Sequence, residues 1–175
     1  MNKIFITGFG AFGKVKRNPS QVLVENLIGF QKMILPVSYN EVDSFIKSNK
    51  LNLYDAILML GVATNANKMR FERFAKNKTG KTPDIEGKVL NGKIELKSPS
   101  KLKGSLFTGL FRETDYWMYS SDAGDYLCNY IYYRVCLKYP YKKVGFLHVP
   151  SFEKINQKTQ QQKLEIILEK ILKTI

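Results

Sequence analysis

The sequence contains few of the residues from which metal sites and disulfide frameworks are built. Its 175 residues include two cysteines and one histidine, whereas most structural zinc modules need four Cys or His ligands. Two cysteines also argue against a disulfide framework, so we expect a reducing, cytoplasmic location. Any chemistry that pairs a serine or cysteine with a histidine must use His148 as its base.

Arginine and long apolar runs are scarce as well. Lysine and arginine together number 28 against 15 acidic residues, a net charge of +13, but only five are arginines. Such a charge permits non-specific binding to phosphate backbones, whereas base readout and bidentate phosphate contacts favour arginine. We interpret the charge as a solvated surface, with nucleic-acid binding as the minor alternative. No apolar run has the length of a membrane span, and no signal peptide precedes the first predicted strand, so we expect no membrane partner.

Alternating strand and helix patterns predict one α/β domain over residues 1–175. The predicted strands cover residues 3–7, 32–37, 54–60 and 143–149. Helices are predicted from an Asn18 cap to about residue 28, from Asn40 onward, over about 123–138, and at the C-terminal end. The last helix carries an apolar stripe of Leu164, Ile167, Leu168, Ile171, Leu172 and Ile175. Residues 78–104 are polar and predict a long loop or a weak hairpin.

The glycine cluster at residues 8–13 (GFGAFG) matches the G-x-G-x-x-G pattern of dinucleotide-binding folds. Its context does not fit that function, because the helix signal comes only at Asn18 and the following strand segment QKMILPV lacks the expected acidic residue. One interpretation is a plain glycine-rich turn at the end of a strand. The functional alternative is a turn that exposes the rings of Phe9 and Phe12 to a flat, apolar group.

Three further residues supply the parts of an acyl-transfer site. Cys128 falls in the early turns of a predicted helix, whose partial positive charge stabilises a thiolate, although it also fits a buried apolar cysteine, as we expect for Cys136. His148 is near the carboxyl end of a predicted buried strand, at the sheet edge where ligands bind, although packing is the more common role there. Glu72 alternates with apolar residues and could equally form a surface ion pair with Arg73.

Five segments, in this order, resemble the pyroglutamyl peptidase I family of cytosolic cysteine peptidases. They are ITGFGAFG with RNPS, LPVSY, LGVATNANKMRFERFAKN with TPDIEG, DAGDYLCNYIYY, and GFLHVP. The pairing of DAGDYLCN with GFLHVP is the specific part of this signal. The resemblance covers nearly the whole chain and implies a three-layer α/β/α sandwich around a mixed, mostly parallel sheet.

The resemblance also implies roles for individual residues. Cys128 would be the nucleophile, His148 its general base and Glu72 the carboxylate that orients the histidine. The apolar walls that hold a pyroglutamyl ring, and the residues near them, would be Phe9, Phe12, Tyr126, Asn18 and Leu127. The implied activity is that of an omega peptidase, which hydrolyses the N-terminal pyroglutamyl residue from peptides through a thioester, without a metal or other cofactor. Its partners would be peptides that begin with pyroglutamate, whereas the oligomeric state, including a homo-oligomer, is left open.

Three positions depart from the family pattern. Val62 stands where bacterial relatives usually have glutamine, although animal relatives also carry valine there. Lys81 replaces an arginine, and Thr82 replaces an apolar residue of the pocket. These changes motivate an alternative function, a diverged amidohydrolase with the same triad and a different small acyl group.

Overall fold

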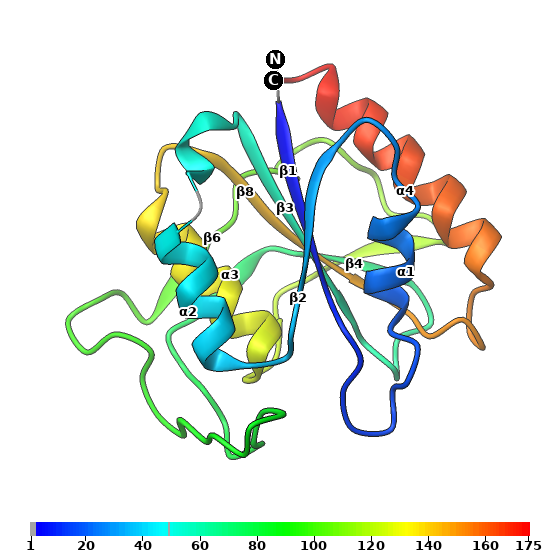
Figure 1. Ribbon diagram of the computed structural model, residues 1–175. Coiled ribbons are helices and arrows are strands. Elements are labelled where there is room, and N and C mark those ends of the chain that lie inside the picture. The colour runs from blue at the N-terminus through cyan, green and yellow to red at the C-terminus, as the bar shows by residue number, and fades with distance from the viewer. Residues whose placement is uncertain (1–2, 49) are drawn as a thin grey trace.

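The computed structural model describes residues 3–48 and 50–175 (Figure 1). Its helices are α1 (Pro19–Glu25), α2 (Tyr39–Ser48), α3 (Leu127–Lys138) and α4 (Gln157–Leu172), with a 3-10 turn η1 (Leu51–Leu53). Its strands are β1 (Ile4–Phe9), β2 (Gln31–Leu35), β3 (Ala56–Val62), β4 (Met69–Glu72), β5 (Phe74–Lys76), β6 (Lys101–Lys103), β7 (Trp117–Ser120) and β8 (Lys143–Val149).

Six of these strands form one sheet in the order β2-β1-β3-β8-β4-β7. The first four are parallel to one another, β4 is antiparallel to β8, and β7 is parallel to β4. The short strands β5 and β6 form a separate antiparallel pair. The predicted mixed, mostly parallel sheet is therefore confirmed.

Helices cover both faces of the sheet. Figure 1 shows α2 and α3 on one face and α1 and α4 on the other. Because successive strand residues point to opposite faces, Phe146 of β8 packs in the core cluster that contains Leu127 of α3. Its neighbour Leu147 packs in the cluster that contains Leu164 of α4. The predicted three-layer α/β/α arrangement is confirmed, with one apolar core on each side of the sheet.

Helix starts follow the local capping residues, with two corrections. Asn18 caps α1 as predicted, since its side chain accepts a hydrogen bond from the Ser20 N–H at 3.0 Å. The second helix, predicted from Asn40 onward, begins one residue earlier at Tyr39, and the Ser38 hydroxyl accepts a hydrogen bond from the Glu41 N–H at 3.2 Å. Helix α3 begins four residues later than predicted, because Gly124 has φ +82°, which a right-handed helix does not allow.

Two other sequence predictions can be compared with the fold. Gly8 lies inside β1 rather than ending it, and a Cβ there would approach the Ser20 carbonyl oxygen to 2.7 Å, so glycine allows α1 to pack closely on β1. The predicted apolar stripe of the last helix is confirmed from Leu164 to Leu172, whereas Ile175, also partly buried, lies beyond the end of α4. Across the described residues, no helix combines the length and apolar character that a membrane span requires.

Candidate functional site

The three predicted catalytic residues come from three different elements that meet at one end of the sheet. Cys128 is the second residue of α3, His148 is the penultimate residue of β8, and Glu72 is the last residue of β4. In the sheet, His148 lies between Gly61 of β3 and Arg70 of β4. This places His148 near the carboxyl ends of the parallel strands, the edge where open α/β sheets bind ligands.

Glu72 and His148 form a buried pair. The distance from His148 Nδ1 to Glu72 Oε1 is 2.8 Å, and Glu72 is only 1% exposed. The alternative of a surface ion pair between Glu72 and Arg73 is therefore wrong: β4 is covered on both edges by β8 and β7, and the Arg73 guanidinium lies over the Tyr119 ring at 4.9 Å. The Tyr132 hydroxyl donates to the Glu72 carbonyl oxygen at 2.8 Å, which fixes the strand end against α3.

The surroundings of His148 favour its protonated form. Burial alone would lower the pKa of this imidazole, because burial disfavours charge. Contacts with the side chains of Cys128 and Glu72 outweigh burial and raise the pKa of His148 from 6.5 to about 9. Because Nδ1 is bonded to Glu72, the second ring nitrogen, Nε2, is the one left for Cys128 or a substrate.

A cavity of about 150 Å³ opens beside the thiol and the imidazole. Its lining includes seven of the eight predicted site residues: Phe9, Phe12, Asn18, Tyr126, Leu127, Cys128 and His148. Glu72, the eighth, lies behind His148 rather than in the wall. An apolar cavity of about this volume can hold one benzene-sized ring, so the site suits a single small ring next to a thiol.

The aromatic walls differ from the predicted turn with two exposed rings. Phe9 ends β1 and is 3% exposed, so its ring belongs to the apolar core as well as to the cavity. Phe12 is only partly buried and lies in a tight turn closed by two backbone hydrogen bonds with Val15. Tyr126 is fixed by donation of its hydroxyl to the Pro83 carbonyl oxygen at 2.8 Å.

Asn18 has a positioning role in this structure. Its amide donates to the Gly10 carbonyl oxygen at 2.8 Å, and its side-chain oxygen accepts from both the backbone N–H and the hydroxyl of Ser20. These bonds connect the turn after β1 to the start of α1. The side chain therefore fixes the turn that carries Phe12.

Several residues around the site were not singled out as site residues by the sequence. Val37, Val62 and Ala123 complete the cavity wall, and Val62 had been noted only as a departure from the family pattern. A Cβ on Gly61 would lie 2.5 Å from Cys128 Sγ, so glycine is needed there to leave room for the thiol. Neither Lys81 nor Thr82 lines this cavity, and both are exposed.

Asn129, next to Cys128, anchors the start of α3. Its amide donates to the carbonyl oxygens of Lys76 and Lys78, and its side-chain oxygen accepts from the Lys76 N–H, all at 2.8 Å. It is fully buried, so this network fixes the first turn of α3 to the last residue of β5 and to the segment that follows it. The sequence showed an asparagine in the DAGDYLCN segment but gave no signal for its bonding partners.

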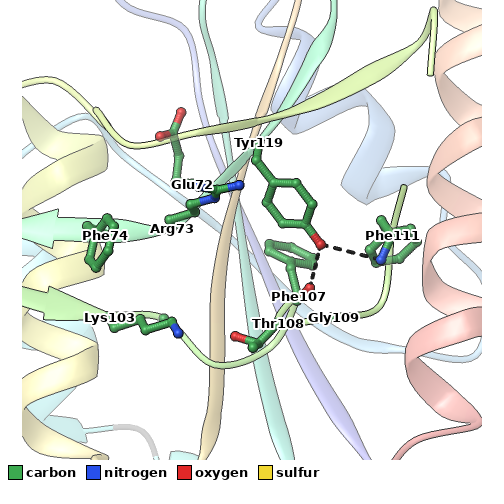
Figure 2. Close-up of a pocket in the computed structure, with 10 residues that line it drawn as sticks. Glu72, Arg73, Phe74, Lys103, Phe107, Thr108, Gly109, Phe111 and Tyr119 are labelled. Carbon is green, nitrogen blue, oxygen red and sulfur yellow. Dashed lines mark hydrogen bonds between the residues drawn. The ribbon is translucent and has the colours of Figure 1, made fainter. Parts of the chain in front are cut away.

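A larger cavity, of about 340 Å³, is lined in part by Glu72 and Arg73 and has no thiol or imidazole in its wall (Figure 2). Figure 2 shows Tyr119 and Phe107 at its centre, with the Glu72 carboxyl group pointing away from it. Its volume exceeds that of the cavity beside Cys128, but the thiol and the imidazole line the smaller one. Within the described ranges, no three His, Cys, Asp or Glu side chains are grouped so as to hold a metal ion.

The comparisons with known proteins all point to one family. The family described as pyroglutamyl peptidase matches residues 2–175. The chain is 32% identical over 180 residues to a pyrrolidone-carboxylate peptidase of Saccharolobus islandicus, covering 90% of this chain and 84% of that one. A relative of the same name from Lactobacillus acidophilus is 31% identical over 172 residues, which are 85% of this chain and 83% of the relative. The crystal structure of the pyrrolidone carboxyl peptidase from Thermus thermophilus superposes with a TM-score of 0.80 at 27% identity, covering 95% of this chain and 98% of the other.

Proposed function

The chain belongs to the pyroglutamyl peptidase family, and from that premise we propose that Cys128, His148 and Glu72 are the catalytic triad with which it removes N-terminal pyroglutamyl residues from peptides. The observation that carries the proposal is the shared cavity. The Cys128 thiol and the His148 ring both line a space for one small ring, with the Glu72 carboxylate bonded to the far side of the imidazole.

In the first step, the Cys128 thiolate attacks the carbonyl carbon of the pyroglutamyl residue. The scissile C–N bond breaks, and Nε2 of protonated His148 gives its proton to the leaving amine, so that a thioester remains on Cys128. His148 then takes a proton from water, which attacks the thioester, releases pyroglutamate and restores the thiolate. Glu72, through Nδ1, keeps the ring oriented and supports its charge during both steps.

The start of α3 supports the developing negative charge on the carbonyl oxygen. The first N–H groups of a helix have no partner within the helix, and Cys128 is the second residue of α3. Backbone donors of this kind contribute roughly 3–4 kcal/mol each to an oxyanion in comparable enzymes. We assign the oxyanion site to the N–H groups near Cys128.

The cavity wall fits the chemistry of the substrate ring. The pyroglutamyl lactam is uncharged and has no free α-amine, whereas an ordinary N-terminus carries an ammonium group. The apolar part of the cavity wall includes Phe9, Phe12 and Leu127, and no carboxylate lines the cavity. Burial of an unpaired ammonium is costly, so the site selects against ordinary N-termini.

The proposed reaction also bears on the cellular compartment of the protein and on its domain organisation. Both cysteines are free thiols, as a thiol nucleophile requires. We therefore expect the enzyme to work in a reducing compartment, the cytoplasm. The site residues extend from Phe9 to His148, so we expect residues 1–175 to act as one catalytic domain.

A panel of fluorogenic amides tests the proposed function. The purified protein is assayed with the aminomethylcoumarin amides of pyroglutamate, proline, glutamate and acetylalanine. We expect release of the fluorophore from the pyroglutamyl amide alone. Absence of that release, with hydrolysis of another acyl amide instead, would overturn the substrate assignment and favour the diverged amidohydrolase.

A further inference from the structure

A second hollow adjoins the catalytic cavity on the side of the turn after β1. It measures about 330 Å³, and Val62 lines both it and the catalytic cavity. Its walls come from residues 14–17 and from the segment 151–153 that follows β8. Figure 1 shows these two segments, the blue one after β1 and the orange one before α4, at the same end of the sheet. The hollow is therefore next to the site without being part of the ring-binding space.

Basic residues outnumber acidic ones in the walls of this hollow. Lys14, Lys16 and Arg17 line it, against one carboxylate, that of Glu153. In the described part of the chain, none of the three basic side chains forms an ion pair with a carboxylate. The hollow thus has an excess of positive charge that the fold does not neutralise.

Arg17 is exposed, but its guanidinium makes two contacts that orient it. Its guanidinium donates to Gln157 Oε1 at 2.7 Å and lies over the Phe152 ring at 5.6 Å. A guanidinium fixed in this way loses less conformational entropy when it binds an anion than a mobile side chain does. Phe152 also gives the hollow an apolar surface beside its charges.

The size of the catalytic cavity limits how much of the substrate it can hold. With the pyroglutamyl ring in the cavity of about 150 Å³ and its carbonyl carbon at Cys128, the rest of the peptide must lie outside. Val62 lines both spaces, so the hollow with the basic residues lies directly beside the ring-binding cavity, within reach of the residues that follow pyroglutamate.

We propose that the hollow bounded by Lys14, Lys16, Arg17 and Phe152 is the subsite for the leaving peptide, and that it selects a negative charge in the residue after pyroglutamate. The proposal rests on the proposed function and adds its substrate class, peptides with an acidic second residue. The negative charge can come from a side-chain carboxylate or, in a dipeptide, from the C-terminal carboxylate. The basic side chains would bind either carboxylate in the same way, and separate substrates distinguish the two.

Matched peptides test the subsite. The kcat/KM for amine release is measured by mass spectrometry for the amides pyroglutamyl-Glu-NH2, pyroglutamyl-Gln-NH2 and pyroglutamyl-Lys-NH2, and for the free acid pyroglutamyl-Gln. Glu and Gln have nearly the same shape, so their ratio isolates the charge. We expect the Glu amide to exceed the Gln amide by about fivefold at low ionic strength, the effect of one exposed ion pair. This ratio should approach one in about 1 M salt, where charges are screened beyond roughly 3 Å.

Two variants assign the preference to the proposed wall. Replacement of Lys14, Lys16 and Arg17 by Gln should reduce the Glu-to-Gln ratio to about one, and Lys14→Glu with Lys16→Glu should reverse the preference toward the Lys amide. The matched control replaces Lys93, Lys97 and Arg112, three exposed basic residues outside both cavities, by Gln. It removes the same net charge and should keep the ratio of the unmodified enzyme.

The outcomes separate this inference from the proposed function. A higher rate for the Glu amide supports a side-chain carboxylate, and a higher rate for the free acid than for its amide supports the C-terminal carboxylate. Equal rates for all four peptides, or a ratio that falls equally in the control variant, would overturn the subsite while the pyroglutamyl activity stands. Hydrolysis of none of them would overturn the proposed function and the subsite together.

Discussion

Helix α3 carries both cysteines of the chain, and its two halves give them different surroundings. Cys128, in the first turn, lines a cavity together with His148. Cys136 lies eight residues further along, within the apolar core, where burial raises the pKa of its thiol to about 12. The same side chain thus has a base and a substrate-sized space at one position and only apolar neighbours at the other. The two thiols therefore differ in their position relative to β8 and not in residue type.

The largest difference between the cysteines should appear in turnover. Cys128→Ala removes the atom that forms the thioester, so kcat for a pyroglutamyl amide should fall by at least about 10⁴-fold, as in other enzymes that lose their nucleophile. Circular dichroism should show an unchanged fold. Equal losses of activity in Cys128→Ala and Cys136→Ala would show that Cys128 is structural.

The carboxylate behind His148 should have the next largest effect. Glu72→Gln keeps the shape but removes the charge, so kcat/KM should fall by about 10²- to 10⁴-fold. The pKa of His148 should fall below about 9, because contact with Glu72 helps to raise it. NMR titration can follow this pKa directly, since His148 is the only histidine in the sequence. An unchanged pKa in the variant would contradict the assigned role.

The same shift predicts how stability depends on pH. The pKa of His148 is higher in the folded chain than its ordinary value of 6.5, so protonated His148 stabilises the fold fully below pH 6.5. This contribution is lost as the pH rises through about 9. Urea titrations should therefore give a free energy of unfolding that falls between these pH values. The fall should be smaller in Glu72→Gln, and an equal slope in both proteins would argue against the linkage.

The ring-binding wall is best tested at Phe12. Loss of a ring that contacts the lactam removes burial and stacking of about 2 kcal/mol, so Phe12→Ala should lower kcat/KM by about 30-fold. Alkylation of Cys128 by iodoacetamide should stay near its original rate, which separates weaker binding from a damaged triad. Phe9→Ala is a poorer test, because Phe9 also belongs to the core and truncation of a buried Phe costs about 3–5 kcal/mol of stability. An unchanged kcat/KM in Phe12→Ala would place the ring elsewhere.

The smallest effect should come from Cys136. Its replacement by alanine leaves a small defect in the core and should lower the free energy of unfolding by about 1 kcal/mol, with kcat/KM within about twofold. In the unmodified enzyme, peptide mapping after brief treatment with iodoacetamide should find the label on Cys128 and not on Cys136, because the buried thiol stays protonated. Labelling of both cysteines at similar rates would remove the contrast between the two ends of α3.

The sequence predicted those parts of the fold that depend on local signals. The Asn18 cap, the buried strand at residues 143–149 and the apolar stripe of the last helix each follow from neighbouring residues. The burial of Glu72 could not be predicted in that way, because it depends on β4 inserting between β8 and β7, two strands distant in sequence. For the same reason, the alternation in the segment around Glu72 was compatible with an exposed face.

The candidate site, like the fold, was only partly predictable from the sequence. Cys128, His148 and Glu72 were proposed through the family resemblance, because Cys128 and His148 alone also fitted packing roles and Glu72 alone also fitted a surface ion pair. Their meeting in space depends on long-range contacts, such as the bonds of Asn129 to residues 76 and 78 that fix the start of α3. The double role of Phe9, in both core and cavity, likewise required the tertiary structure.

The central claim is that Cys128 carries the acyl group during turnover. The most direct measurement mixes the enzyme with a pyroglutamyl ester, quenches the reaction in acid within milliseconds, and locates the acyl group by peptide mass spectrometry. The account predicts a pyroglutamyl thioester on the peptide that contains Cys128, and no adduct in the Cys128→Ala variant. An acyl group on another residue, or full turnover by Cys128→Ala, would contradict it.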